Sequence, residues 1–452
     1  MKITPTFAAR AIGPAFLAGG VIGTLMAFLA VSVLDSRAAV QRANPPTLAK
    51  LKESFRRPAT TPFPADNPFT EEKRALGEKL FNDTRLSANN AISCASCHQP
   101  NKGYGDGNPL SSGVPGRSLA RHTPHLWNLA FGRAQFWDGR ARGLEDQVGF
   151  PIQNPDEMAQ DPEKMVAQLS ADADYKQRFA AAFPQNAAIS MESIARALAT
   201  YERTFVSPLT RFDRWIGGDN KALNASEVRG FRLFNGKAQC ANCHSGWNFT
   251  DQGFYDIGMP DEDRGRGAVL RLPVADHAFK TPGLRELRHS APYMHDGSMA
   301  TLTDVIKHYQ TGIVARSTLP PELPRNLKLD ARERRDLIAF LDTLSSEQGA
   351  KSPALVAETT KDTSPAVQIS TVSQDDKTFH PGHIGVKRGE RMWIVNNDSR
   401  THNVRVFNPA FEFDSGAQEP GEIVEMTFPA AGSFLVFCGI HPKMELTVDV
   451  AD

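Results

Sequence analysis

The spacing of apolar residues divides the chain into two regions with different secondary structure. Between residues 70 and 344, apolar residues recur every three to four positions in four segments, at 71–81, 191–205, 226–233 and 330–344. Since a helix turns once in about 3.6 residues, this spacing gives each segment one buried face. We therefore predict that this region consists mainly of helices joined by long loops.

The C-terminal region, residues 373–452, follows a two-residue repeat instead. Alternating apolar and polar residues occupy five segments, at 385–398, 401–407, 422–428, 433–437 and 446–450. Turn-forming Gly, Pro and Asn-Asp separate these segments, so the pattern predicts a small β-sandwich. Two histidines, His380 and His383, are expected to precede the first strands as surface residues.

Two further segments lack any hydrophobic period. Residues 349–371 are rich in Ser, Thr, Ala, Lys and Pro, and residues 44–67 are polar and rich in Pro. Such composition is typical of connectors rather than packed elements. We predict a linker before the sandwich and a spacer before the helical region.

The N-terminal segment has the features of an export signal. Lys2 and Arg10 precede an almost uncharged apolar run at 11–34, which is long enough to span a bilayer. We predict an uncleaved anchor in the inner membrane, with cleavage near Ala38 and Ala39 as the alternative. Positive charge before the run places the rest of the chain in the periplasm.

The overall composition narrows the range of functions. The chain of 452 residues is long enough for about three domains. It carries 51 basic and 51 acidic residues, so its net charge gives no support for nucleic-acid binding. Four of the five cysteines fall in two copies of one motif, and the fifth lies beside His and Met residues.

The repeated motif is Cys-x-x-Cys-His, which occurs at residues 94–98 and 240–244. This spacing is the attachment signature of a c-type haem, and the terminal His becomes an axial iron ligand. The predicted residues are the thioether-forming Cys94, Cys97, Cys240 and Cys243 and the iron ligands His98 and His244. A zinc site and a thioredoxin-like redox pair are the alternatives. Related segments, Leu-Phe-Asn-Asp and Leu-Phe-Asn-Gly, precede the two motifs and indicate a duplicated unit.

The fifth cysteine belongs to a predicted copper site. Cys438, His441 and Met444 lie in one segment near the C-terminus, and His402 lies upstream. Two His, one thiolate and one thioether are the ligands of a mononuclear type 1 copper centre. This pattern resembles the cupredoxin family, although the spacing of His441 and Met444 is shorter than in plastocyanin. The alternative is an immunoglobulin-like domain with a buried Cys.

The segments around the Cys-x-x-Cys-His motifs carry a second resemblance. They read Arg-His-Thr-Pro at 121–124, Gln-Phe-Trp-Asp-Gly-Arg-Ala at 135–141, Leu-Glu-Asp-Gln at 144–147, Pro-Ile-Gln-Asn-Pro-Asp-Glu-Met at 151–158, Phe-Lys-Thr-Pro at 279–282 and Ala-Pro-Tyr-Met-His-Asp-Gly-Ser at 291–298. In this order and spacing, residues 70–347 resemble the bacterial diheme cytochrome c peroxidases and their relative MauG.

The two resemblances imply a multidomain fold: two mainly α cytochrome c-type haem domains followed by a β-sandwich cupredoxin domain. The predicted boundaries are a signal anchor or signal peptide at 1–40, a spacer at 41–69, haem domains at 70–210 and 211–348, a linker at 349–372 and a copper domain at 373–452. The peroxidase resemblance implies that the His98 haem is peroxidatic and that the His244 haem transfers electrons.

The peroxidase resemblance also assigns roles to four residues. Trp137 is expected to relay electrons between the haems. Gln147, Pro151 and Glu157 are expected to line the distal pocket of the first haem. Glu157 would move a proton during cleavage of the peroxide O–O bond, a task suited to a partly buried carboxyl group.

The chain departs from the family pattern at the first haem. Many diheme peroxidases carry a His ligand in a loop that corresponds here to residues 111–117, and this loop contains no His. We therefore expect an open, five-coordinate first haem that needs no reductive activation. His122 and His125 are the nearby alternatives for that ligand.

A second departure concerns the other haem and the calcium ion of the family. Tyr309 stands where typical members have a Met ligand, and Tyr is the ligand in MauG. His308 and Met294 are alternative ligands, and Tyr309 could also simply pack on the haem. The resemblance implies calcium bound by carbonyls of Ser290 and Pro292, but His122 replaces the usual Asn and an oxygen ligand is lost.

These observations predict an exported peroxidase that reduces hydrogen peroxide to water. Electrons from a periplasmic donor, such as a small cytochrome c or copper protein, would pass through the fused copper domain and the second haem. The alternatives are a MauG-like oxidase that acts on a protein substrate through two stored oxidising equivalents, and an electron carrier without peroxide chemistry.

Overall fold

The computed structural model describes residues 48–114, 116–132, 134–321, 323–347, 370–375, 377–398, 400–408, 410–438 and 444–452. No helix in these ranges is long and apolar enough to cross a membrane. The predicted membrane anchor, most of the predicted linker and the predicted copper ligand His441 lie outside the described residues.

The predicted order of a helical region followed by a β region is confirmed. The helices of four or more residues are α1 (Leu48–Ser54), α2 (Glu71–Phe81), α3 (Cys94–Cys97), α4 (Leu144–Gln147), α5 (Gly149–Gln153), α6 (Pro162–Ala171), α7 (Ala173–Ala182), α8 (Met191–Glu202), α9 (Arg211–Ile216), α10 (Ala225–Phe234), α11 (Arg266–Leu270), α12 (Leu302–Lys307), α13 (Ala331–Asp342) and the π-helix η7 (His308–Gly312). Shorter 3₁₀ turns are η1 (Thr84–Leu86), η2 (Pro100–Lys102), η3 (Leu129–Phe131), η4 (Cys240–Asn242), η5 (Pro273–Ala275) and η6 (Leu287–His289). A small two-stranded antiparallel sheet pairs β1 (Phe254–Asp256) with β2 (Ala278–Lys280).

The duplication seen in the sequence appears as two similar helix pairs. In the first half, α2 packs against α8, and a Cβ added at Gly77 would lie 2.1 Å from Ala197 O. In the second half, α10 packs against α13, and a Cβ added at Gly230 would lie 2.0 Å from Asp336 O. Both glycines stand three residues before the Leu-Phe-Asn segment. Each therefore allows the backbones of its helix pair to touch.

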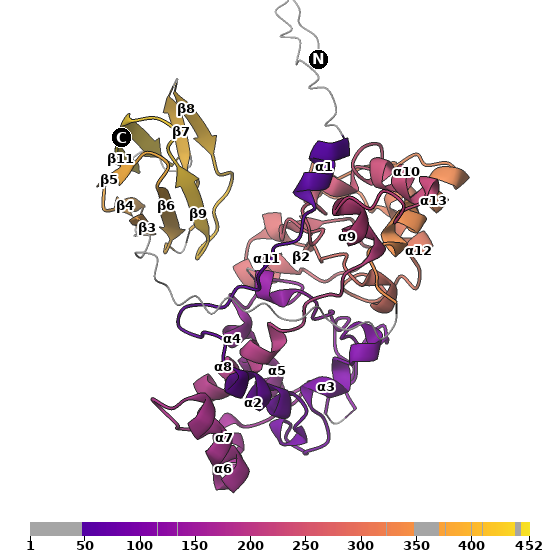
Figure 1. Cartoon of the computed structure of the whole chain (residues 1–452), viewed down its shortest axis with the longest axis vertical. Helices are drawn as coiled ribbons and strands as arrows, with labels where there is room; N and C mark the ends of the chain where they lie inside the picture. The colour runs from indigo at the N-terminus through magenta and orange to yellow at the C-terminus, as the bar shows by residue number, and fades with distance from the viewer. Residues whose placement is uncertain are drawn as a thin grey trace, which may run out of the picture.

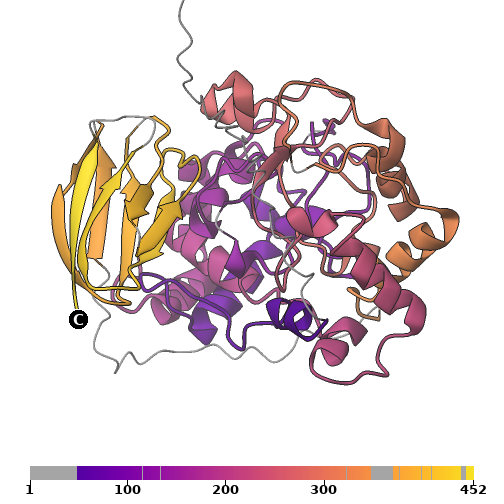
Figure 2. The same cartoon turned by 90° about the horizontal axis from the view of Figure 1, so that it is seen from above.

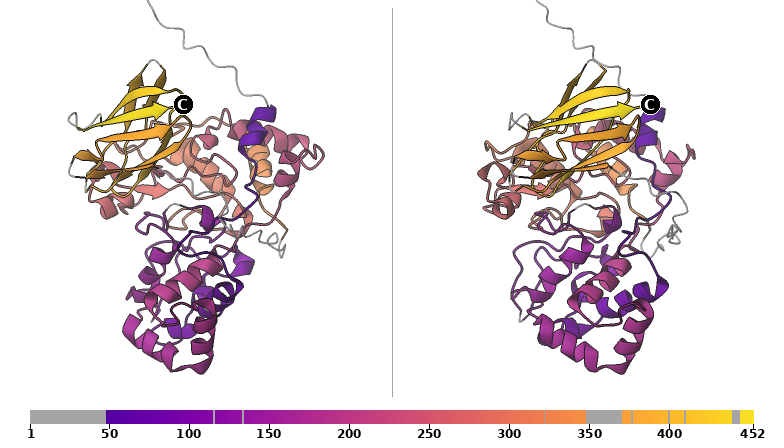
Figure 3. Two further views of the ribbon diagram at one scale, coloured as in Figure 1. Left: turned by 60° about the vertical axis from the view of Figure 1, so that its left-hand side comes forward. Right: turned by 90° about the vertical axis from the view of Figure 1, so that its left-hand side faces the viewer.

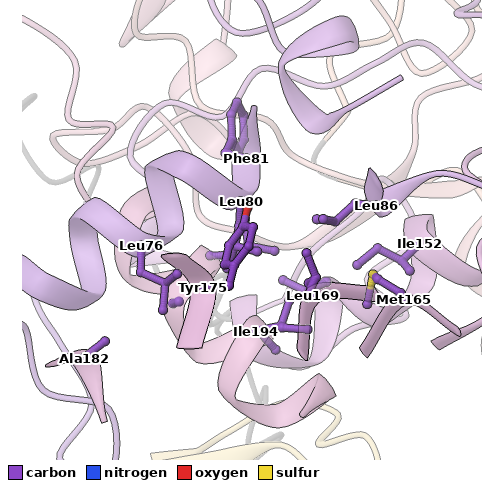
Figure 4. Close-up of a cluster of buried hydrophobic side chains, with 14 of the residues drawn as sticks. Leu76, Leu80, Phe81, Leu86, Ile152, Met165, Leu169, Tyr175, Ala182 and Ile194 are labelled. Carbon is purple, nitrogen blue, oxygen red and sulfur yellow. The ribbon is translucent and has the colours of Figure 1, made fainter. Parts of the chain in front are cut away.

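Each half buries its own apolar core. In the first half, side chains from α2, α5, α6, α7 and α8 point toward one another, including Leu76, Leu80, Ile152, Met165, Leu169, Tyr175 and Ile194 (Figure 4). The second core is mainly aromatic and contains Phe55, Phe212, Phe231, Phe234, Phe249 and Phe340. Figure 1 shows the two halves stacked along the long axis of the molecule. Residues that lie between the two cores belong to neither core, so they can line a site shared by both halves.

The C-terminal region is a sandwich of two sheets. Its strands are β3 (Ser370–Asp375), β4 (Thr378–His380), β5 (His383–Lys387), β6 (Arg391–Asn396), β7 (Arg405–Asn408), β8 (Phe411–Asp414), β9 (Ile423–Thr427), β10 (Gly432–Phe437) and β11 (Glu445–Ala451). One sheet has the order β5-β11-β10-β7-β8 and the other β4-β3-β6-β9. Alternate residues such as Val372, Ile394, Val436 and Leu446 face the core between them.

The strand boundaries correct one detail of the prediction. His380 ends β4 and His383 begins β5, so these residues do not precede the first strands, although both are exposed surface residues. The first strand, β3, begins at Ser370, inside the segment predicted as linker. In that strand only Val372 and Gln374 are buried, and a single apolar residue in a polar run gives little alternation to detect.

Candidate haem and copper sites

The first Cys-x-x-Cys-His motif forms a single helical turn, α3, which His98 ends. The Nδ1 atom of His98 lies 2.8 Å from Tyr104 O. Because a carbonyl oxygen can only accept, Nδ1 must carry the proton, and Nε2 is left with a lone pair for iron. This hydrogen bond fixes both the tautomer and the orientation that an axial ligand needs.

The second motif repeats this arrangement. The turn η4 holds Cys240, and His244 Nδ1 donates a hydrogen bond to Phe249 O over 2.9 Å. Both acceptor residues have left-handed backbones, with φ of 61° at Tyr104 and 57° at Phe249. Non-glycine residues rarely adopt this conformation unless the surrounding structure holds them in it. In both halves, the carbonyl that orients the His belongs to a residue with this rare backbone conformation. This similarity supports the prediction that both motifs are haem sites.

Burial favours the uncharged thiol at three of the four motif cysteines, Cys94, Cys97 and Cys240. No disulfide joins them, and burial raises the pKa of Cys97 to about 11 and that of Cys240 to about 12. The zinc alternative needs further ligands beside each Cys pair. Within the described ranges, no cluster of three or more His, Cys, Asp or Glu side chains forms a metal site.

One large cavity runs from the first motif toward the second half. Its volume is about 940 Å³, and Cys94, Cys97 and His98 line one wall. Residues of the second half, including Asn248 and Pro282, line another. The residues present therefore fit a haem held by the first motif.

The residues predicted for the distal pocket all line this cavity. Gln147 ends α4, Pro151 lies in α5, and Glu157 follows α5. Burial raises the pKa of Glu157, while a hydrogen bond from Asn154 Nδ2 at 3.3 Å and the charge of Arg140 act in the opposite direction. The net shift is upward, so the Glu157 carboxyl group holds a proton more readily than an exposed Glu does, as a proton-transfer group requires.

The loop at residues 111–117 packs directly on the turn that carries Glu157. Val114 N donates a hydrogen bond to Glu157 O over 2.7 Å. A Cβ added at Gly113 would lie 1.9 Å from Asp156 O. The loop is thus held beside Glu157 by backbone contacts, and the five-coordinate first haem stays a prediction.

Trp137 is held by both halves at the edge of the cavity. Its Nε1 atom donates to His122 O over 2.8 Å, and its carbonyl accepts from Lys280 N over 2.7 Å. The first bond orients the indole, and the second attaches the backbone of Trp137 to the other half. A relay between two haems needs such a position.

The two alternative histidines are bonded to backbone carbonyls at the cavity wall. His122 Nδ1 donates to Asn108 O over 2.8 Å, and His125 Nε2 donates to Gly283 O over 3.1 Å. Burial lowers the pKa of His125 to about 4, so its ring is neutral. The side chain of His122 is used in this bond, and calcium near it stays a prediction.

Near the second motif, the structure distinguishes two of the three candidate ligands, Tyr309 and His308. Tyr309 lies in the π-helix η7 and packs on the aromatic core beside Cys240, and burial raises the pKa of its phenol. His308 points elsewhere, since its Nε2 donates to Ile257 O over 2.8 Å. Met294 begins the turn that ends at Gly297. A π-turn is frequent at functional sites, and here it directs Tyr309 toward the second motif.

The sandwich brings together three of the four predicted copper ligands. Cys438 follows β10, and its Sγ lies 3.7 Å from His402 Nδ1, close enough for both to bind one metal ion. Asn403 N donates to Sγ over 3.5 Å, and Cys438 N donates to Met444 O over 3.1 Å. His402, Cys438 and Met444 are at most 1% exposed. These residues fit a thiolate copper centre, while His441 is not described.

Sequence reasoning missed several residues of these sites. Asp398 holds the other ring nitrogen of His402, with 3.2 Å between Oδ2 and Nε2. Lys280 lines the haem cavity and donates from Nζ to Ala134 O over 2.8 Å, and burial lowers its pKa to about 8. Glu202 lines the same cavity, and burial raises its pKa to about 8. Glu202 stands on the buried stripe of α8, and this pattern was visible in the sequence.

The chain is similar to known proteins. A family model described as di-haem cytochrome c peroxidase matches residues 71–221. The methylamine utilization protein MauG of Methylorubrum extorquens is 43% identical over 340 residues, covering 75% of this chain and 96% of that protein. Cytochrome c551 peroxidase of Pseudomonas aeruginosa is 33% identical over 310 residues, covering 66% of this chain and 86% of that protein. The crystal structure of a MauG-like protein associated with microbial copper homeostasis matches with a TM-score of 0.61 and 32% identity, covering 65% of this chain and 95% of the other. A purple cupredoxin from Nitrosopumilus maritimus matches 18% of this chain and 99% of its own, with 19% identity and a TM-score of 0.17.

Proposed function

Because the chain belongs to the family of di-haem cytochrome c peroxidases and MauG, we propose that it reduces hydrogen peroxide at the His98 haem with electrons supplied through its copper domain and second haem. Each peroxide takes two electrons and two protons and yields two water molecules. The enzyme is an oxidoreductase of the peroxidase type.

The observation that carries the proposal is the convergence of Gln147, Pro151 and Glu157 on the cavity beside His98. The haem held by Cys94 and Cys97 supplies the redox chemistry when bound. Around it, Glu157 accepts the proton of the near peroxide oxygen and returns it to the far oxygen, which leaves as water. Pro151 offers no side-chain hydrogen bond there, so Gln147 and Glu157 orient the substrate.

The electron supply uses the remaining predicted residues. His402, Cys438, His441 and Met444 would hold one copper ion that exchanges electrons with a periplasmic donor, a small cytochrome c or copper protein. Tyr309 would bind the second haem opposite His244, and a phenolate lowers the haem potential relative to Met. Trp137, bonded to both halves, would carry electrons onward.

Replacing Glu157 by Gln tests the peroxidatic assignment. The change keeps the size of the side chain and removes its proton exchange, so kcat/KM for peroxide should fall by about 10²- to 10⁴-fold. The measurement is steady-state peroxide turnover with a reduced small cytochrome as donor. Glu163→Gln, on the exposed face of α6, is the matched control and should retain full activity. Unchanged turnover in Glu157→Gln would show that the assignment is wrong.

A second candidate function is oxidation of a protein substrate, favoured by the position of Tyr309 and by the 43% identity to MauG. The same haem chemistry would then draw its two electrons from aromatic side chains of a partner protein. Comparing peroxide turnover with a reduced cytochrome donor against peroxide-dependent modification of a candidate partner protein separates the two functions. Fast turnover with the cytochrome supports the peroxidase, and modification without such turnover supports the oxidase.

A further inference from the structure

The loop between β8 and β9, residues 415–422, is attached to the predicted copper ligand His402. His402 N donates to Gln418 O over 2.9 Å, and Gln418 N donates to His402 O over 2.7 Å. Thr401 Oγ1 also donates to Glu419 Oε2 over 2.8 Å. The loop and the copper ligands therefore share one end of the sandwich.

This loop also meets the helical body. A Cβ added at Gly421 would lie 3.5 Å from the guanidinium carbon of Arg142, which precedes α4. Figures 2 and 3 show the sandwich beside the body. The loop attached to His402 thus contacts the first half of the helical body, at Arg142.

Charges of opposite sign face each other at this contact. The loop contributes Glu419 and Glu422, and the body contributes Arg142 and Arg266. Burial lowers the pKa of Arg266. The carboxylates of Glu422 and Glu419 oppose this shift, as does that of Asp138 in the helical body. The acidic loop therefore contributes negative charge near Arg266, in addition to that of Asp138.

On the body side, the contact leads to the relay residue. Arg266 Nη1 donates to Gly139 O over 2.8 Å and to Asp138 O over 3.2 Å. These two residues directly follow Trp137, which lines the cavity between the halves. The route from His402 to Trp137 thus runs through the loop, the arginine and two residues of backbone.

The contact is polar and partly open to solvent, with Arg266 and Glu419 half-buried. Arg142, Gly421 and Glu422 are all exposed. Transient electron-transfer encounters typically use small interfaces, and charge complementarity sets their orientation. A tether makes such a weak contact effective, because it keeps the local concentration of the partner high.

We propose that the sandwich docks reversibly on the helical body, with Glu419 and Glu422 against Arg142 and Arg266, so that electrons from the copper centre reach the haem pair at Trp137. This inference rests on the proposed function and names the surface that it uses. Each transfer oxidises Cu(I) to Cu(II) and delivers one electron to the haems, and the external donor then reduces the copper. Two transfers and two protons serve one peroxide.

Charge reversal in the full-length protein with haem and copper bound tests the docking. Glu422→Lys and Arg142→Glu should each slow electron transfer from reduced copper to haem by about tenfold or more at low salt. The double variant should recover most of the rate. Asp452→Lys is the control and should match the parent protein. It makes the same charge change as Glu422→Lys, but just after β11, at the end of that strand away from Met444.

Two measurements distinguish the outcomes. Flash reduction of the copper gives the transfer rate, and small-angle X-ray scattering reports whether the sandwich separates from the body, with larger dimensions expected in both single variants. Unchanged rates and dimensions in these variants would overturn the docking surface and leave the copper supply intact. Failure of copper to reduce haem in the parent protein would instead contradict the proposed electron supply, and scattering alone would then decide whether the sandwich docks.

Discussion

Glu202 should make the stability of the protein depend on pH. Its side chain lies on the buried stripe of α8 with Ile194 and Leu198, and it is 6% exposed. Its Oε2 atom has no hydrogen-bond partner among the described residues, and burial raises its pKa to about 8 from an ordinary 4.5. Near neutral pH the folded protein therefore holds a proton here that the unfolded chain releases.

The sign of the effect follows from the raised pKa. The contribution of Glu202 to the free energy of unfolding is fully present below pH 4.5 and is lost as the pH rises through 8, because the carboxylate forms readily only in the unfolded chain. Glu202→Gln keeps the shape and cannot ionise. From the two pKa values, the variant should exceed the parent in free energy of unfolding by about 1 kcal/mol at pH 5 and about 4 kcal/mol at pH 8.

Urea unfolding of the haem-loaded protein, followed by haem absorbance between pH 5 and 8, measures this difference. Glu192→Gln is the matched control, since Glu192 lies on the same helix with a side chain 73% exposed. Its effect should stay within a few tenths of a kcal/mol and should not vary with pH. A Glu202→Gln difference that is flat across this range would refute the argument that Glu202 is buried and protonated.

Two further predictions concern the metal ligands. Tyr309→Met should raise the reduction potential of the second haem and change its electron paramagnetic resonance signal, leaving the first haem's signal as it is; Tyr293→Phe in the same core is the control. Identical spectra in Tyr309→Met and the parent would show that Tyr309 is no ligand. Asp398→Ala removes the partner of His402 Nε2 and should weaken copper binding by about 10- to 100-fold in a competition titration, with haem absorbance unaffected. Asp414→Ala, on β8 of the same sandwich, should bind copper like the parent, and equal affinity in Asp398→Ala would show that this carboxylate does not position His402.

Much of the helical region could be predicted because its signals are local. The segment predicted at 71–81 has the bounds of α2, and the segment at 330–344 contains α13. Both begin after a side-chain cap and carry an apolar face that a short window can detect. The strands β3, β4 and β8 were not predicted, since short edge strands and polar runs owe their conformation to their neighbours in the sheet.

The sequence by itself determined which atoms we predict to attach the haems, because the two thiols and the imidazole of each motif lie within five consecutive residues. Only the tertiary structure decided which nitrogen of each imidazole is free, since the acceptor carbonyls belong to Tyr104 and Phe249 in left-handed turns. It likewise directed His308 to Ile257 and Tyr309 toward the second motif. The order of residues alone sets the spacing of the Cys and His side chains within each motif. Burial and hydrogen-bond partners depend on segments far apart in the chain, which meet only after folding.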